Sequence, residues 1–255
     1  MYPFGLDSWG NKKGRLLNMN TAYGHPGLVV EAVPEVRAAF IRRTYTHLAM
    51  AILAFIGLEV IFFQSGLATA LFSVLVKGGR IGWLAVLAAF MAVSWIADKW
   101  AHSSTSLGVQ YIGLSVYVLA EAIIFVPLLY IAAIFGGENI IPIAAIITGL
   151  LFLGLTVTAF TTRKDFSFLG PILCIGGFVA LGTIVAGAVF GFNLGIVFAG
   201  AMVLFAGGAI LYSTSNIIHH YNTDQHVAAS LSLFASVALL FWYVLRILIA
   251  LTSRD

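Results

Sequence analysis

The stretch Leu211–Ile247, LYSTSNIIHHYNTDQHVAASLSLFASVALLFWYVLRI, decides how the whole chain is interpreted. In it an apolar segment ends at a short polar turn, and a second apolar segment of bilayer-spanning length follows. The turn contains three of the six histidines, and Arg246 lies inside the second apolar segment. Because charged and titratable groups are costly at membrane depth, they are the first candidates for functional residues.

The composition assigns the chain to the membrane proteins. Of its 255 residues, 61% are apolar and 9% are charged, and the mean hydropathy is +1.02. A soluble domain has about a quarter of its residues charged. The apolar residues form runs long enough to cross a bilayer, so the sequence predicts an all-α, polytopic membrane protein. The single Cys174 leaves no intramolecular disulfide and no thiol-based metal cluster.

Seven transmembrane helices are predicted from these runs. They are expected at about 44–63, 81–97, 106–135 and 140–160, twice within 168–211 with a break at 191–193, and at 227–251. Residues 65–77 are apolar but short, which favours an interfacial or re-entrant turn. Residues 1–36 are rich in glycine and proline and are expected to form a flexible cytoplasmic arm before one membrane domain at 37–255.

The basic residues orient the chain in the membrane. Nine of the thirteen lysines and arginines fall on the side of the N-terminus: Lys12, Lys13, Arg15, Arg37, Arg42, Arg43, Lys99, Arg163 and Lys164. Basic residues stay cytoplasmic, so the sequence predicts an N-terminus inside and, with seven spans, a C-terminus outside.

Three charged residues are predicted inside the spans. Glu59 and Glu121 each lie about 15 residues into their helices, about 22 Å deep by helical rise. Arg246 is expected to meet them in the outer half of the bilayer, where pairing would remove most of the desolvation cost. Such a cluster serves either ion or proton passage or helix packing alone, and an arginine that reaches the outer interface is a further alternative. Two carboxylates that share one arginine would leave one glutamate easily protonated.

Polar residues nearer the cytoplasmic face form a second group of candidates. Ser213 and Ser236 are expected either to bond backbone carbonyls of their own helices or to contribute to an ion pathway. Four titratable residues occupy the polar turn: His219, His220, Asp224 and His226. Histidine titrates near neutral pH, so the turn is either a pH sensor or a solvated loop. Its spacing does not support a zinc site, and no metal or cofactor is predicted.

With these residues in view, the chain resembles the Bax inhibitor-1 (transmembrane Bax inhibitor motif) family in its prokaryotic branch. Three segments carry the likeness: FIRRTYTHLAMAILAF at Phe40–Phe55, AFTTRKDFSFLG at Ala159–Gly170, and Ile210–Arg246. The resemblance implies a seven-helix bundle whose last helix is central and wrapped by three hairpins, and it favours the inner membrane of a prokaryote as the location. It also implies a pH-controlled calcium leak through two aspartates of the last two helices. Ser213 and Ser236 stand at those positions here, and serine cannot titrate.

Two functional hypotheses follow from the resemblance and the polar residues. The first is a cation leak pathway with calcium as the permeant ion and with pH-dependent gating. The alternative is a non-conducting regulator that binds membrane proteases or stress and cell-death components. An enzyme is not expected, because the spans lack an HExxH motif and a glycine-rich phosphate loop. The expected partners are therefore the lipid bilayer, calcium and other membrane proteins, without nucleic acid.

Overall fold

The computed structural model describes residues 27–103, 106–162 and 164–252. Within these ranges the chain contains a short 3-10 turn and seven long helices, without a regular sheet. The elements are η1 (Val29–Glu31), α2 (Pro34–Gln64), α3 (Leu67–Ala101), α4 (Leu107–Phe135), α5 (Ile140–Thr162), α6 (Leu169–Phe190), α7 (Gly195–His219) and α8 (His226–Thr252). Each of the seven long helices is apolar and long enough to cross a membrane. The predicted all-α, seven-span class is confirmed.

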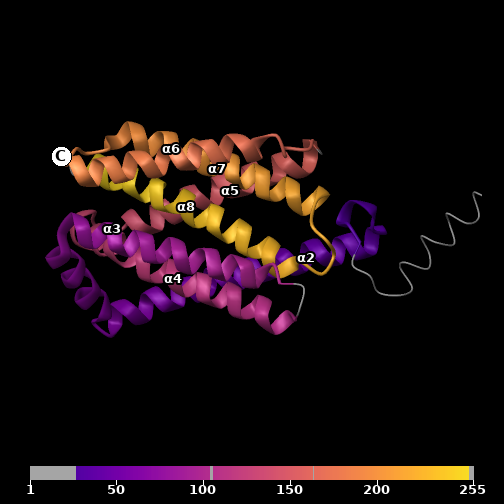
Figure 1. Ribbon diagram of the computed structural model, residues 1–255, viewed down its shortest axis with the longest axis horizontal. Helices are drawn as coiled ribbons and strands as arrows, with labels where there is room; N and C mark the ends of the chain where they lie inside the picture. The colour runs from indigo at the N-terminus through magenta and orange to yellow at the C-terminus, as the bar shows by residue number, and fades with distance from the viewer. Residues whose placement is uncertain (1–26, 104–105, 163, 253–255) are drawn as a thin grey trace, which may run out of the picture.

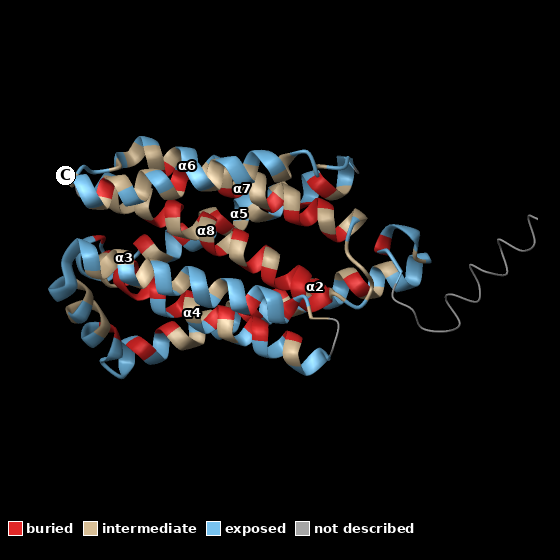
Figure 2. Ribbon diagram, viewed as in Figure 1, coloured by how far each residue is buried: buried red, intermediate tan, exposed pale blue. Residues whose placement is uncertain are grey.

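The helices run back and forth along one axis, and α8 lies at the centre of the bundle. Figure 1 shows α8 between a group formed by α5, α6 and α7 and a group formed by α2, α3 and α4. Helix α8 packs against α2, α4, α5 and α7. Buried positions follow α8 along its length in Figure 2, including Ala228, Leu233 and Leu245, each fully enclosed. The central position of the last helix is therefore confirmed.

The short apolar segment at 65–77 is helical and not a turn. It forms the first part of α3, which then bends at Gly79, where the backbone has φ 57° and ψ −150°. This left-handed conformation is open to glycine because it carries no Cβ. The bend divides α3 into a short first part and a longer second part that runs back along the bundle. The hydropathy of the sequence identified the break between the two parts of α3. The shortness of the first part suggested a turn, although this part is helical.

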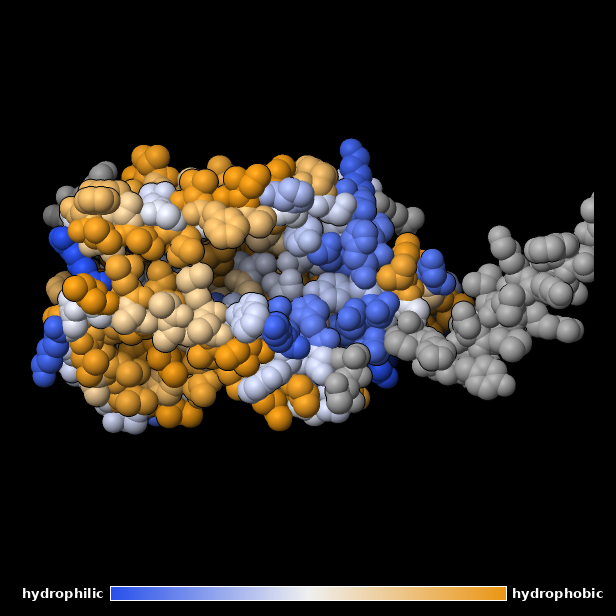
Figure 3. Space-filling model, viewed as in Figure 1, coloured by the Kyte–Doolittle hydropathy of each residue, from blue (hydrophilic) through white to orange (hydrophobic). Residues whose placement is uncertain are grey.

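The outer surface of the bundle is apolar over most of its length. Figure 3 shows hydrophobic residues covering the body of this face, with hydrophilic residues gathered at the end where α2 begins. Large side chains such as Ile81, Val197 and Leu204 are exposed. A contiguous apolar surface of this kind fits a lipid environment and would be unfavourable in water. We call the hydrophilic end, formed by the described residues 27–33, 102–103, 106, 164–168 and 220–225, the polar end.

The chain enters the bundle along the turn between α7 and α8. The N–H of Val29 donates to the carbonyl of Tyr221 at 2.9 Å, and the N–H of Thr223 donates to the carbonyl of Gly27 at 3.1 Å. The Arg37 guanidinium donates to the carbonyl of Val29 and to that of Val30. The later part of the predicted arm is thus held against the α7–α8 turn. The remainder of that arm, residues 1–26, lies outside the described residues.

Candidate functional site

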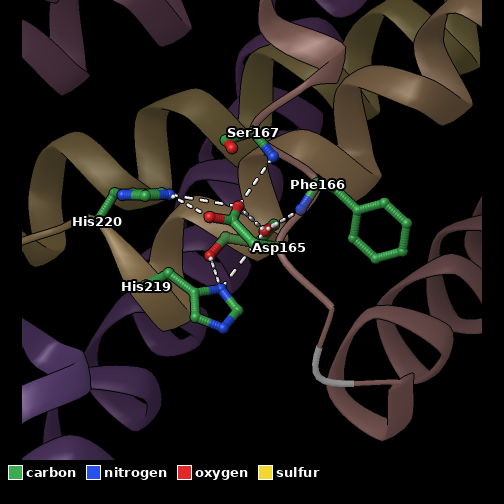
Figure 4. Close-up of polar contacts among 6 residues, drawn as sticks. Asp165, Phe166, Ser167, His219 and His220 are labelled. Carbon is green, nitrogen blue, oxygen red and sulfur yellow. Dashed lines mark hydrogen bonds and ion pairs between the residues drawn. The ribbon is translucent and has the colours of Figure 1, made fainter.

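A hydrogen-bonded cluster joins the loop between α5 and α6 to the last turn of α7. Figure 4 shows Asp165 at its centre, with His220 on one side and the backbone of the loop on the other. Asp165 Oδ2 lies 3.1 Å from His220 Nε2. Its Oδ1 accepts from the Ser167 N–H at 2.9 Å and from the Ser215 hydroxyl at 3.3 Å. Ser215 Oγ in turn accepts from the Phe166 N–H at 2.9 Å.

The local sequence explains how these groups converge. Ser215 and His219 are one helical turn apart on α7, and His219 Nδ1 lies 3.0 Å from the Ser215 carbonyl oxygen. His220 ends the helix as its C-cap residue, so its ring leaves the helix axis beside the loop. Ser215 is fully buried, whereas the side chains of His220 and Asp165 are 49% and 44% exposed. The cluster therefore has a buried hydroxyl anchor and an ion pair open to water.

The electrostatics of the cluster favour a charged carboxylate. The pKa of Asp165 is lowered, first because its carboxylate accepts the Ser167 N–H and further because it bonds to His220. An exposed pair of this kind contributes little to folding stability. The pair is better suited to binding a partner molecule, because both side chains present hydrogen-bond donors and acceptors to water.

The four titratable residues predicted in the α7–α8 turn do not form one cluster. His219 and His220 belong to the Asp165 cluster, and Asp224 is exposed on the turn. His226 begins α8, and its ring packs against that of His47 with centroids 5.0 Å apart. His47 Nε2 lies 2.9 Å from the Tyr111 hydroxyl, so this second group joins α2, α4 and α8. The turn thus has two separate histidine environments.

The two serines expected at the family's aspartate positions do meet. Ser213 Oγ lies 3.3 Å from Ser236 Oγ and 3.0 Å from Ser232 Oγ. The Ser236 hydroxyl also donates to the Ser232 carbonyl one turn earlier at 2.9 Å. Tyr221 lies near Ser232 on the turn side of this group, and burial raises the pKa of Tyr221 to about 12. The result is a neutral chain of hydroxyls between α7 and α8.

The glutamates and Arg246 lie apart. Arg246 lines a cavity with Arg80 at the end of the bundle opposite the polar end, and it forms no ion pair with Glu59 or Glu121. Glu59 is buried with no hydrogen-bond partner for either oxygen. Glu121 is buried within reach of the Tyr117 hydroxyl, one turn earlier on α4. The expected pairing with Arg246 is therefore wrong: helical rise gave the depth of each residue but not the direction it faces.

Sequence reasoning missed Asp165, Ser215 and Ser232. Asp165 lies in the Ala159–Gly170 segment, one of the three that carried the resemblance, and that was the signal available. Its partner His220 is 55 residues later, and a loop-to-helix contact of that separation has no periodicity that a single sequence reveals. Among the described residues, no group of three or more His, Cys, Asp or Glu is arranged to hold a metal ion.

A bundle of seven helices long and apolar enough to span a membrane, with the last at its centre and a hydroxyl chain beside it, defines a class of integral membrane protein. The family model described as "Inhibitor of apoptosis-promoting Bax1" matches residues 37–254. The chain belongs to this family, as the resemblance predicted.

Relatives in bacteria and plants extend this assignment. An uncharacterized protein of Neisseria meningitidis, NMA0420, is 30% identical over 177 residues, or 69% of this chain and 76% of the relative. Protein LIFEGUARD 4 of Arabidopsis thaliana is 28% identical over 84% of this chain and 85% of its own length. The Modulator of FtsH protease YccA of Escherichia coli is 37% identical over 121 residues, which is 47% of this chain and 54% of the relative. The chain is thus similar to a protein named for its effect on a protease.

Proposed function

We propose that this protein is a membrane-embedded regulator that binds another membrane protein through its polar end. The observation that carries the proposal is the contact between the Asp165 carboxylate and the His220 ring, which is exposed and anchored by a buried serine. A surface of this kind recognises a partner by charge and hydrogen bonds, while the apolar body keeps the protein in the same bilayer. We place the polar end on the cytoplasmic side, because Lys164 belongs to it and Arg37, Arg42, Arg43 and Lys99 lie in the adjoining turns of α2 and α3.

The partner class that we propose is a membrane-anchored protease. One relative, YccA of Escherichia coli, bears the name of a modulator of the FtsH protease. The sequence that precedes the membrane domain 37–255 would enlarge the binding surface. Within residues 1–36 the groups suited to contacts with a partner or a membrane surface are Tyr2, Phe4, Trp9, Lys12, Lys13 and Arg15.

The test is the affinity between the full chain in nanodiscs and the membrane protease of the same cell. We expect Asp165→Asn and His220→Gln each to weaken binding about tenfold, the effect of about 1.4 kcal/mol. Glu138→Gln is the matched control, because it removes the same charge from an exposed position in the α4–α5 turn, at the opposite end of the bundle. Unchanged binding in both cluster variants would contradict the role assigned to the polar end.

A second candidate function is a cation leak pathway with calcium as the permeant ion. The hydroxyl chain of Ser213, Ser232 and Ser236 favours it, because hydroxyl oxygens accept hydrogen bonds and can coordinate cations. Glu59 and Glu121 would supply negative charge deeper in the bundle. Calcium entry into liposomes that contain the purified protein tests this function. Flux that is absent, or equal in wild type and in a Glu59→Gln, Glu121→Gln double variant, would count against it.

A further inference from the structure

Two arginines from distant parts of the chain share one cavity at the end of the bundle opposite the polar end. The cavity has a volume of about 470 Å³ and lies where the second part of α3, the α6–α7 turn and α8 meet. Arg80 follows the bend at Gly79, and Arg246 lies in the last turns of α8. Both line the cavity, although 166 positions separate them in the sequence.

The α6–α7 turn fits closely around one of the two guanidinium groups. Gly191 has φ 81°, and a Cβ at this position would overlap the Arg80 guanidinium. The absence of a side chain therefore lets the turn approach the guanidinium directly. Asn193 and Trp83 also line the cavity and carry neutral N–H donors. The polar lining consists mainly of hydrogen-bond donors.

The charges in this cavity are not compensated by the described part of the chain. Neither arginine forms a hydrogen bond or an ion pair with a described residue, and no Asp or Glu lines the cavity. Two cations in one cavity repel each other unless an anion lies between them. Guanidinium groups bind phosphate oxygens with paired, charge-assisted hydrogen bonds, which makes phosphate the best-matched anion.

We propose that this cavity binds a phosphate group between Arg80 and Arg246. The phosphate comes either from the headgroup of an anionic phospholipid or from free inorganic phosphate, and the same donors serve both. The volume leaves room for more than the phosphate itself, and the apolar walls at Leu75 and Val76 suit the adjoining part of a lipid.

The experiment compares the melting temperature of the full chain in phosphatidylcholine nanodiscs, in nanodiscs that also contain phosphatidylglycerol, and in phosphatidylcholine nanodiscs with added inorganic phosphate. We expect stabilisation by phosphatidylglycerol, by phosphate, or by both, and the arm that responds identifies the source. In the Arg80→Gln, Arg246→Gln double variant the affinity for the stabilising lipid or phosphate, obtained from the dependence of the melting temperature on its concentration, should fall about tenfold or more. This is the effect of losing charge-assisted hydrogen bonds.

Lys77→Gln is the matched control, because Lys77 is exposed one turn before Arg80 and does not line the cavity. The conservative Arg80→Lys and Arg246→Lys variants should retain part of the response, so a folding defect in the Gln variants leaves the proposal testable. No response in either arm, or an equal response in the double variant, overturns it.

Discussion

The carboxylate of Asp165 lies 3.1 Å from His220 Nε2 and so fastens the α5–α6 loop to the end of α7. The same carboxylate accepts a loop N–H and a buried hydroxyl, so one side chain orders a whole connection. Because α7 packs closely on the central α8, the loop is tied to the core of the bundle through this contact. A partner that bound at the polar end would therefore contact a loop that is linked through α7 to the central helix α8.

The Asp165→Asn variant should loosen the loop without unfolding the protein. An amide accepts more weakly than a carboxylate and cannot pair with a protonated histidine, while an exposed pair adds little to global stability. We expect faster hydrogen exchange of the Phe166 and Ser167 amides, measured by mass spectrometry in nanodiscs. The exchange of α8 amides should stay as in wild type. Faster exchange throughout the bundle would show instead that Asp165 stabilises the whole fold.

The Ser215→Ala variant tests the buried anchor. Its hydroxyl is fully enclosed and accepts the Phe166 N–H, so its removal leaves a half-buried donor without a partner. The expected loss of stability is about 1–2 kcal/mol. Ser230→Ala is the control: Ser230 is equally buried, but its hydroxyl bonds only within its own helix, to the Val227 carbonyl. Equal losses in the two variants would contradict a specific role for Ser215.

The polar end should contain a pH-dependent stabilising contact at His102. Its pKa is raised, chiefly by the hydrogen bond to the Asp98 side chain. A histidine whose pKa is higher in the folded state stabilises the fold fully below its unfolded pKa, and this contribution disappears as pH rises through the folded value. The stability difference between wild type and Asp98→Asn should therefore shrink from mildly acidic to alkaline pH. Nuclear magnetic resonance titration of His102 checks the direction of the shift. In the Asp98→Asn variant the pKa of His102 should return towards its ordinary value.

Gly191→Ala should destabilise the α6–α7 turn. The positive φ of 81° disfavours a side chain, and the added Cβ would meet the Arg80 guanidinium. A loss of about 1–2 kcal/mol is expected from the backbone conformation alone. Gly200→Ala is the control, since open space surrounds Gly200 inside α7 and alanine favours helix by about 1 kcal/mol over glycine. A thermal melt that ranks the two variants in the opposite order would contradict this account of the turn.

The fold followed from the sequence because lipid imposes a simple rule. Every backbone polar group must be paired within the membrane, so long apolar runs become helices, and the breaks at Gly79 and Gly191 fall where glycine and neighbouring polar residues occur. The site was harder to predict. The hydroxyls of Ser213 and Ser236 lie within hydrogen-bond distance, a contact that the sequence did not predict. Arg246 lines a cavity with Arg80 and not with a glutamate. Depth can be counted along a helix, but the facing direction depends on how all seven helices pack.

The most direct test of the regulatory function is site-specific photocrosslinking in the native membrane. A photoreactive amino acid at position 224, on the polar end, should crosslink to the membrane protease, and one at position 77, at the opposite end, should not. Crosslinks that form from position 77 but not from position 224 would contradict the claim that the polar end is the surface through which this protein acts.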